Sequence, residues 1–255
     1  MNVVAIVPTL NEENNILDCL ESLAWADRRV VFDCFSTDRT VELARQAGAE
    51  VIQHPFENFA QFHNAAMEQV GADWIFFVDA DERATPELAS EIRETVAADR
   101  EEVLWWVPRH NYIFGRLTLG AGWYPDYQAR LLRQGRAHWE RPVHEIAVAD
   151  GPEGYLEHPL IHYNYDDLPD FVARQERYNK IDAGILLDEG VHPRFYTPYS
   201  QAVRQFWWRF VTLRGARDGL HGLWLSLLMA YYEMKKYRLL AGLWRAASVD
   251  GFDQI

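Results

Sequence analysis

The first hundred residues alternate between short, β-branched apolar runs and stretches with helical spacing of apolar residues. This pattern is typical of parallel strands joined by helices. The runs that predict strands are residues 3–7, 30–32, 51–52 and 74–78. The stretches that predict helices are about residues 14–24, 37–47 and 59–70, and a further helix is expected from Thr85-Pro86-Glu87, with Thr85 as its N-cap. The sequence therefore predicts an α/β fold built on a largely parallel sheet.

Two of the predicted strands lead directly into aspartates. Asp33 follows residues 30–32, and Asp79 follows residues 74–78. Because the carboxyl ends of parallel strands form the ligand crevice of such sheets, we expect both side chains to face one cleft. Asp79-Ala80-Asp81 also places two carboxylates one residue apart, and such a pair can hold a hard cation together with nucleotide phosphates. The triplet alone is a weak signal, since ordinary loop acids also occur in this spacing.

Charge and cysteine content narrow the function classes. With a formal net charge of −13, the chain lacks the positive charge that binds phosphate backbones, so we expect no nucleic-acid partner. Cys19 and Cys34 have no metal-ligand spacing, which fits a reducing cytoplasm. The N-terminus lacks the basic region and the long apolar run of a signal peptide, and we therefore expect a cytoplasmic protein.

The C-terminal part differs in composition from the rest. Residues 199–245 carry eight basic and two acidic residues, a charge of +6 against −19 elsewhere in the chain. Their longest apolar run, residues 223–232, is well short of the roughly 20 residues that cross a bilayer. We expect residues 198–245 to make a peripheral contact with the inner face of the cell membrane, with helices packed on protein as the alternative.

Three segments carry a resemblance to a known family. They are Pro8-Thr9-Leu10-Asn11-Glu12-Glu13, residues 31–40 with the sequence VFDCFSTDRT, and Val78-Asp79-Ala80-Asp81-Glu82-Arg83. Together they resemble family 2 glycosyltransferases of the GT-A fold, particularly those similar to lipopolysaccharide core β-1,4-glucosyltransferases. The likeness continues through residues 123–126, 130–133 and 142–145. It implies a GT-A catalytic domain over residues 1–165, a Rossmann-like mixed sheet flanked by helices, with a donor half (1–100) and an acceptor half (101–165). A basic and aromatic helical extension would follow over residues 166–255.

The resemblance also implies roles for individual residues. The donor nucleotide would contact Pro8, Thr9, Glu12, Asp33, Asn64 and Asp79, with Asp33 accepting from the uracil N3–H. A Mg²⁺ or Mn²⁺ ion would be held by Asp79 and Asp81, with His162 as an additional ligand and His144 as an alternative to it. Glu145 would be the catalytic base and Asp126 the second choice, unless these acids form salt bridges to Arg130 or Arg141.

Two positions depart from the family pattern. Phe35 stands where relatives commonly have a glycine, so we expect the loop to differ locally or the ring to cover something. His63 stands before Asn64, where a lysine or arginine is usual, which makes a phosphate or base contact from this helix less certain.

The function predicted from these observations is inverting transfer of a hexose from a UDP-sugar, with UDP-glucose as the first candidate. The acceptor would be a hydroxyl of a glycan or lipid-linked saccharide, as in the synthesis of cell-envelope polysaccharide or glycolipid. One alternative is a non-catalytic nucleotide-sugar-binding or scaffold protein. Another is a nucleotidyltransferase, although the glycine-rich phosphate loop expected after its first strand is missing. The sequence indicates no oligomeric state.

Overall fold

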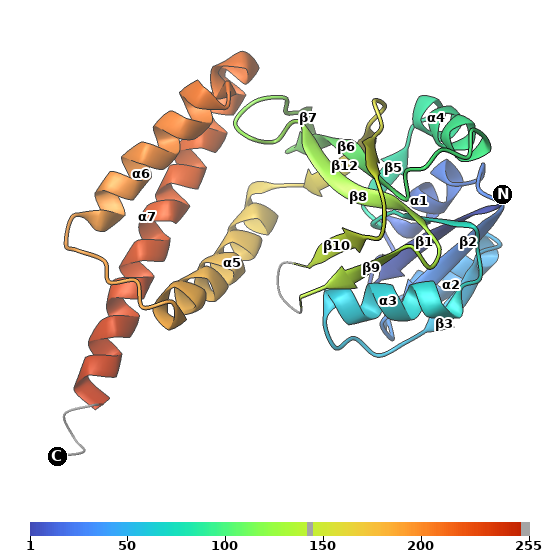
Figure 1. Ribbon diagram of the computed structural model, residues 1–255. Coiled ribbons are helices and arrows are strands. Elements are labelled where there is room, and N and C mark those ends of the chain that lie inside the picture. Colours follow the sequence, from blue (N-terminus) through green and yellow to red (C-terminus); the bar gives the residue numbers. More distant parts are fainter. Residues whose placement is uncertain (142–144, 251–255) are drawn as a thin grey trace. The chain divides into compact units, whose positions relative to one another are not determined.

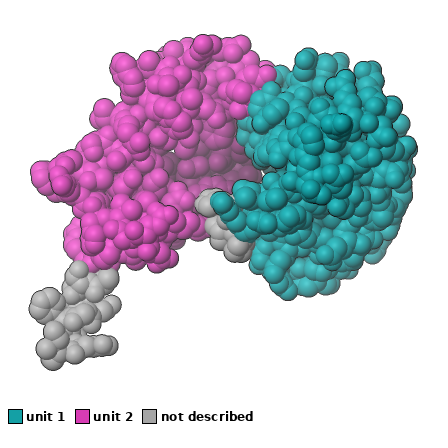
Figure 2. Space-filling model, viewed as in Figure 1, with its two compact units in different colours: residues 1–110, 126–163 teal, residues 111–125, 164–255 magenta. Residues whose placement is uncertain are grey.

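The computed structural model describes residues 1–141 and 145–250, with side chains described up to residue 246. It consists of two compact units: residues 1–110 with 126–163, and residues 111–125 with 164–255 (Figure 2). The second unit thus combines a short internal segment with the C-terminal helices. The domain boundary at residue 165 stays a prediction from the sequence.

The elements follow one another in an order that Figure 1 shows. The N-terminal part contains β1 (Val3–Thr9), α1 (Ile16–Ser22), β2 (Arg28–Asp33), α2 (Thr40–Gln46), β3 (Glu50–Gln53), α3 (Phe59–Gln69), β4 (Trp74–Phe77), β5 (Glu82–Ala84) and α4 (Pro86–Ala97). The middle part contains β6 (Leu104–Ile113), β7 (Arg116–Leu117), β8 (Asp126–Arg133), β9 (Ala137–Glu140), β10 (Ile146–Ala149), β11 (Glu153–Tyr155) and β12 (Leu160–Tyr165). The C-terminal part contains α5 (Leu168–Asp188), α6 (Thr197–Trp207), the π-helical turn η1 (Trp208–Thr212), the 3-10 turn η2 (Gly215–Asp218) and α7 (Gly219–Asp250).

The strands and helices predicted for the first hundred residues are all present. Thr85 caps α4 as expected, because its side chain accepts from the Leu88 N–H. The predicted start of α2 is wrong by two to three residues: its N-cap is Arg39, which makes no capping bond through its side chain. Asp38 instead accepts from the Thr40 backbone N–H at 2.9 Å, so it stabilises the first turn from one position further out.

The main sheet is mixed rather than parallel throughout. Its strand order is β3-β2-β1-β4-β8-β6-β12-β5, and β3, β2, β1 and β4 run parallel. Strand β8 pairs antiparallel with both β4 and β6, and β12 pairs antiparallel with β5. The fold class predicted from the sequence, an α/β sheet flanked by helices with a C-terminal helical extension, is confirmed.

Alternation along β1 explains how both faces of the sheet are covered. Val3, Ala5 and Val7 pack with buried residues of α1, α2 and α4, whereas Val4 and Ile6 pack with α3 and the β9–β10 hairpin. All five side chains are buried, because a strand covered on both faces exposes neither. The carboxyl ends of β1, β2 and β4 are therefore the positions of this region that remain open for a ligand.

The second unit has a core of its own. Ile113, Tyr165 and Phe171 pack with Leu225 and Tyr232 of α7. Part of α7 therefore packs on protein, which agrees with the alternative to membrane contact that the sequence left open for residues 198–245. No helix within residues 1–141 and 145–250 is both long and apolar enough to span a bilayer.

Candidate functional site

Two loops interlock at the carboxyl ends of β1 and β2. The Asn11 N–H donates to the Ser36 hydroxyl at 2.8 Å, and Asn11 Oδ1 accepts from the Thr37 N–H at 2.8 Å. The Glu13 N–H donates to the Asp38 carboxylate at 3.0 Å. Because each loop satisfies backbone groups of the other, the two form one ordered rim at this edge of the sheet.

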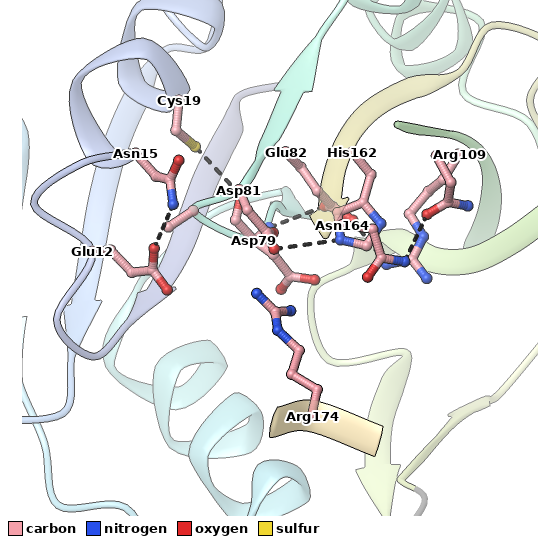
Figure 3. Close-up of polar contacts among 12 residues, drawn as sticks. Glu12, Asn15, Cys19, Asp79, Asp81, Glu82, Arg109, His162, Asn164 and Arg174 are labelled. Carbon is pink, nitrogen blue, oxygen red and sulfur yellow. Dashed lines mark hydrogen bonds and ion pairs between the residues drawn. The ribbon is translucent and has the colours of Figure 1, made fainter. Parts of the chain in front are cut away.

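Three predicted donor-site residues lie on the first loop of this rim or just before it. Pro8 is half-buried near the end of β1, and Thr9 is buried. Glu12 is half-buried, and its carboxylate accepts from the Asn15 side-chain amide at 2.9 Å (Figure 3). These residues share one edge of the sheet with Asp33, and their contacts with a nucleotide stay a prediction.

Asp33 is fully buried and receives four hydrogen bonds. Its oxygens accept from the Thr9 hydroxyl at 3.1 Å, the Ser36 N–H at 3.0 Å, the Ser36 hydroxyl at 2.5 Å and Gln53 Nε2 at 3.0 Å. A carboxylate offers about four acceptor positions, so all of them are in use here. To accept from a uracil N3–H as well, Asp33 would have to release one of these donors.

Phe35 adopts a positive φ, although a phenylalanine side chain was expected to disfavour this backbone conformation. Its φ is +53°, in the left-handed region where glycine is favoured. The expectation that the loop changes its backbone there is therefore wrong. The ring is 54% exposed. An outlier of this kind costs of the order of 1 kcal/mol or more, and the interlocked rim supplies the contacts that hold it in place.

Asp79 and Asp81 follow strand β4 and contact different partners. Asp79 accepts from the Arg130 guanidinium, with one Nη1–Oδ1 distance of 3.3 Å and a second, closer contact through Nη2. Asp81 instead approaches His162, whose Nε2 lies 3.4 Å from its Oδ2. Figure 3 shows Asp79, Asp81, Glu82 and His162 gathered at this end of the sheet. The sequence prediction grouped Asp81 with His162, and the structure brings these two together.

Strand pairing explains why His162 reaches this position. β12 runs antiparallel to β5, with His162 opposite Glu82. The backbone N–H of the next residue, Tyr163, donates to the Asp81 carbonyl at 3.0 Å. His162 is 7% exposed, so its ring is held against the Asp81 turn by the sheet itself.

A buried charge network supports the Asp79 turn. Glu82 is fully buried and accepts from Arg130 Nη2 at 2.6 Å, from Arg109 Nη1 at 3.1 Å and from the Asp79 N–H at 3.0 Å. Arg109 also pairs with Asp126 at 2.6 Å. Asp126 is thus in a salt bridge, but with Arg109 rather than with Arg130 or Arg141, the partners that the sequence suggested.

Asp79 and Arg130 stabilise each other's charged form. Burial alone would raise the pKa of the Asp79 carboxyl, but the Arg130 guanidinium outweighs burial and holds that pKa well below its usual range. Burial likewise opposes the charge of Arg130, and Asp79 and Glu82 more than restore it, which raises the Arg130 pKa. The stabilisation from Asp79 is complete above the ordinary carboxyl pKa of 3.8 and is lost as the pH falls from there through the lower folded-state pKa.

Glu82 and Arg109 were missed in the sequence. A signal existed, because Glu82 directly follows the Asp79-Ala80-Asp81 triplet, and Arg130 interrupts the apolar run Ala129–Leu132. A charged side chain inside a buried strand needs a partner, and each of these residues is the partner of another. The sequence does not indicate which charged residue pairs with which, since Glu82 and Arg130 lie 48 positions apart.

Asn64 has a structural role in this fold. Its Nδ2 donates to the Trp139 carbonyl at 2.8 Å, and its Oδ1 accepts from the Trp139 N–H at 2.8 Å. The amide therefore behaves like one more strand residue and fastens α3 to β9. Its contact with a donor nucleotide stays a prediction.

His63 connects the candidate base with the Asp79 network. Its ring is 7% exposed and stands 2.8 Å through Nδ1 from the Phe59 carbonyl. Burial lowers the pKa of the imidazole, whereas that hydrogen bond and the charges of Asp79 and Glu145 act to raise it. One buried ring thus senses both Asp79 and Glu145. Pro142, Val143 and His144 lie outside the described residues.

The described residues contain no group of three or more His, Cys, Asp and Glu side chains that could hold a metal ion. Asp81 and His162 form a pair. The Asp81 carboxylate is an oxygen ligand of the kind that suits Mg²⁺ or Mn²⁺, and a cation bound there would take further ligands from substrate phosphates and water.

The charge network predicts that a substitution at Glu82 strongly destabilises the fold. Replacing Glu82 by Gln should lower the free energy of unfolding by about 3 kcal/mol, because the buried Arg130 and the half-buried Arg109 lose a charge partner. Glu68→Gln, at an exposed position of α3, is the matched control and should change stability by less than about 0.5 kcal/mol. Chemical denaturation measures both. Equal effects of the two substitutions would show that the network does not stabilise the fold.

Comparison with known proteins identifies the family to which the chain belongs. The model of the family described as Glycosyl transferase family 2 matches residues 4–148. The lipopolysaccharide core biosynthesis glycosyltransferase LpsC of Rhizobium meliloti (strain 1021) is 30% identical over 205 residues, covering 75% of this chain and 74% of LpsC. An uncharacterised glycosyltransferase of Rickettsia bellii (strain RML369-C) is 25% identical over 221 residues, covering 82% of this chain and 74% of that protein.

Solved structures resemble the chain at a lower level. TarS 1–349 of S. aureus in complex with UDP-GlcNAc has a TM-score of 0.49 at 13% identity, covering 97% of this chain and 92% of that one. Glucosyl-3-phosphoglycerate synthase of Mycobacterium tuberculosis, in complex with Mn²⁺, UDP and phosphoglyceric acid, has a TM-score of 0.49 at 17% identity, covering 75% and 80%. The family match spans more than half of the chain and includes the Asp79–Asp81 turn, so this protein belongs to glycosyltransferase family 2.

Proposed function

We propose that this glycosyltransferase is an inverting hexosyltransferase that moves a hexose from a UDP-sugar, UDP-glucose being the first candidate. The acceptor is a hydroxyl of a glycan or lipid-linked saccharide in the synthesis of cell-envelope polysaccharide or glycolipid. The observation that carries this proposal is Asp81 beside His162 at the carboxyl edge of the sheet, next to an Asp79 held by the buried Arg130. The role of the relative LpsC in lipopolysaccharide core biosynthesis supports the choice of acceptor.

Asp81 and His162 are the proposed ligands of Mg²⁺ or Mn²⁺. A cation bound there would neutralise charge on the departing diphosphate. Asp79, the third predicted ligand, already has Arg130 on its carboxylate, so we place it mainly at the ribose and phosphates. Pro8, Thr9, Glu12, Asp33 and Asn64 complete the proposed donor site, with Asp33 and Asn64 acting largely through the loops and strands that they fasten.

Glu145 is the proposed base. It takes the proton from the acceptor hydroxyl as that oxygen attacks the anomeric carbon and the UDP oxygen leaves from the opposite face. Glu145 forms no hydrogen bond or ion pair with another described residue, and it is half-buried within electrostatic reach of His63. Asp126 is the second candidate, but its carboxylate is committed to Arg109.

A substitution at Asp81 tests the metal site. Asp81→Asn should weaken UDP binding in the presence of Mn²⁺ at least tenfold and leave the weaker binding in EDTA unchanged, because a carboxylate ligand is lost. Asp18→Asn, at an exposed position of α1, serves as the control. Calorimetric titration of UDP and UDP-glucose, with and without Mn²⁺, gives both numbers. Retained Mn²⁺ dependence in the Asp81 variant would remove Asp81 from the metal site.

A second substitution tests the base. Glu145→Gln should reduce kcat by roughly two to four orders of magnitude while UDP-glucose binding stays within about twofold, because proton removal is lost and the donor site is not. Glu140→Gln, at an exposed position of the same hairpin, should retain activity. Single-turnover transfer of labelled hexose is the measurement. Full activity of the Glu145 variant would move the role to Asp126, and donor binding without transfer in the unmodified protein would favour the scaffold alternative.

We also propose that residues 198–245 contact the inner face of the cell membrane from the cytoplasm. Val203 and Trp207 of α6 are 71% and 64% exposed, and residues 190–217 contain five arginines and no acidic residue. Tryptophan and arginine together suit the headgroup region of an anionic bilayer.

Substitutions on α6 test this membrane contact. The Val203→Ser, Trp207→Ser double variant should lower the partition coefficient onto phosphatidylglycerol vesicles about tenfold or more in co-sedimentation, because two apolar side chains no longer insert. Leu17→Ser is the control, since this side chain of α1 is 45% exposed but lies outside residues 198–245. Unchanged sedimentation of the double variant would exclude α6 as the contact.

A further inference from the structure

The second unit contains a hollow of about 980 Å³ that the proposed transfer reaction does not use. Its wall is formed by residues that precede α6, by the first turn of α6 and by the C-terminal part of α7. The lining residues used in the argument are His192, Arg194, Tyr199, Arg238, Trp244 and Arg245. We call this site the arginine hollow.

The arginine hollow is cationic within an acidic protein. Arg194, Arg238 and Arg245 line it, and among the residues whose side chains the structure describes no aspartate or glutamate lines it. Among the described side chains, these three guanidiniums make no salt bridge. Their hydrogen bonds go to uncharged oxygens, namely the Tyr196 hydroxyl at 3.0 Å, the Tyr199 hydroxyl at 3.2 Å and the Ala241 carbonyl at 3.2 Å. Most of their N–H donors therefore remain available to an anion.

Aromatic rings order the wall of the hollow. His192 stacks on Trp244 with ring centroids 3.7 Å apart, and Trp244 Nε1 donates to the Val191 carbonyl at 2.8 Å. The Arg238 guanidinium lies over the Tyr199 ring, 5.4 Å from its centroid. Stacking restricts the guanidinium without consuming its donors, so the positive groups are partly preorganised for a ligand.

We propose that the arginine hollow binds a phosphate-bearing anion. Guanidinium groups match the oxygens of phosphate in charge and geometry. Three of them line one hollow, which is more positive charge than a ligand with a single carboxylate would need. The ring-lined wall suits an apolar or ring-shaped group attached to that phosphate. Two sources share this chemistry: the phosphate of a soluble phosphorylated saccharide and the headgroup of an anionic phospholipid. The proposal does not depend on the transfer reaction, because the hollow is built from other residues than the donor site.

The test measures anion binding by the full chain in EDTA, where metal-dependent nucleotide binding is absent. Calorimetric titrations with inorganic phosphate and with glucose 6-phosphate probe the soluble source. Flotation with phosphatidylglycerol vesicles, compared with phosphatidylcholine vesicles, probes the lipid source. We expect binding from at least one source, weakened by added salt. Binding to neither would overturn the proposal.

Paired variants locate the binding. The Arg238→Gln, Arg245→Gln double variant should bind the anion at least tenfold more weakly, because two charged forks are lost. The Arg116→Gln, Arg177→Gln double variant removes the same charge from exposed positions of the same unit outside residues 198–245 and should bind normally. Equal losses in both variants would show a general charge effect and refute a built site.

Two further measurements separate folding and donor binding from the hollow. If the glutamine variant melts at a lower temperature, the Arg238→Lys, Arg245→Lys variant keeps the charge and should still bind about threefold or more weakly, because lysine lacks the planar fork. Wild-type affinity of the lysine variant would refute recognition by guanidinium forks. Saturating UDP with Mn²⁺ should not displace the anion, and displacement would place the phosphate in the donor site instead.

Discussion

The candidate site depends on one buried carboxylate, that of Glu82, placed between two arginines. A buried charge is costly unless it is paired and hydrogen-bonded, and Glu82 satisfies this requirement through Arg130, Arg109 and the Asp79 N–H. The two guanidiniums extend from the antiparallel strands β8 and β6, whereas Asp79 lies in the turn between β4 and β5 and Glu82 is the first residue of β5. The turn that carries the proposed metal ligand is thereby tied to the half of the sheet that follows it.

This arrangement separates the roles of two aspartates that look equivalent in the sequence. Asp79 neutralises Arg130 and is held by it, so its carboxylate has a fixed position and a lowered pKa. Among the described residues, Asp81 has the imidazole of His162 as its one ion-pair partner, at 3.4 Å. For the proposed UDP-sugar donor, with its anionic diphosphate, a carboxylate without a guanidinium on it is the one better able to take a cation as a ligand. The physical contrast therefore favours Asp81 over Asp79 at the proposed metal site.

The sequence predicts most of the fold near this site because local signals and global topology agree there. Apolar runs, helix caps and the strand-end aspartates give β1 to α4 with few errors. Pairings between distant strands carry no such signal, and this is why the Glu82–Arg130 and Arg109–Asp126 contacts were not predicted. Phe35 failed for a different reason: the tertiary contacts of the rim outweigh a backbone preference of the order of 1 kcal/mol, so the residue type misled the prediction. Segment 111–125 groups with the C-terminal helices through long-range packing that composition does not reveal.

Charge distribution adds a last constraint on how such a protein can meet its substrates. A chain with a net charge of −13 repels phosphate-bearing molecules at long range, yet both a nucleotide sugar and a lipid-linked or phosphorylated acceptor carry negative charge. Two local solutions are visible. At the sheet edge, the proposed cation on Asp81 would bridge to phosphate, and in the second unit arginines that form no salt bridge with a described side chain are proposed to bind an anion directly. Because the first solution needs a divalent metal and the second does not, the two anion sites can be controlled independently, and metal removal should separate donor binding from anion binding in the arginine hollow.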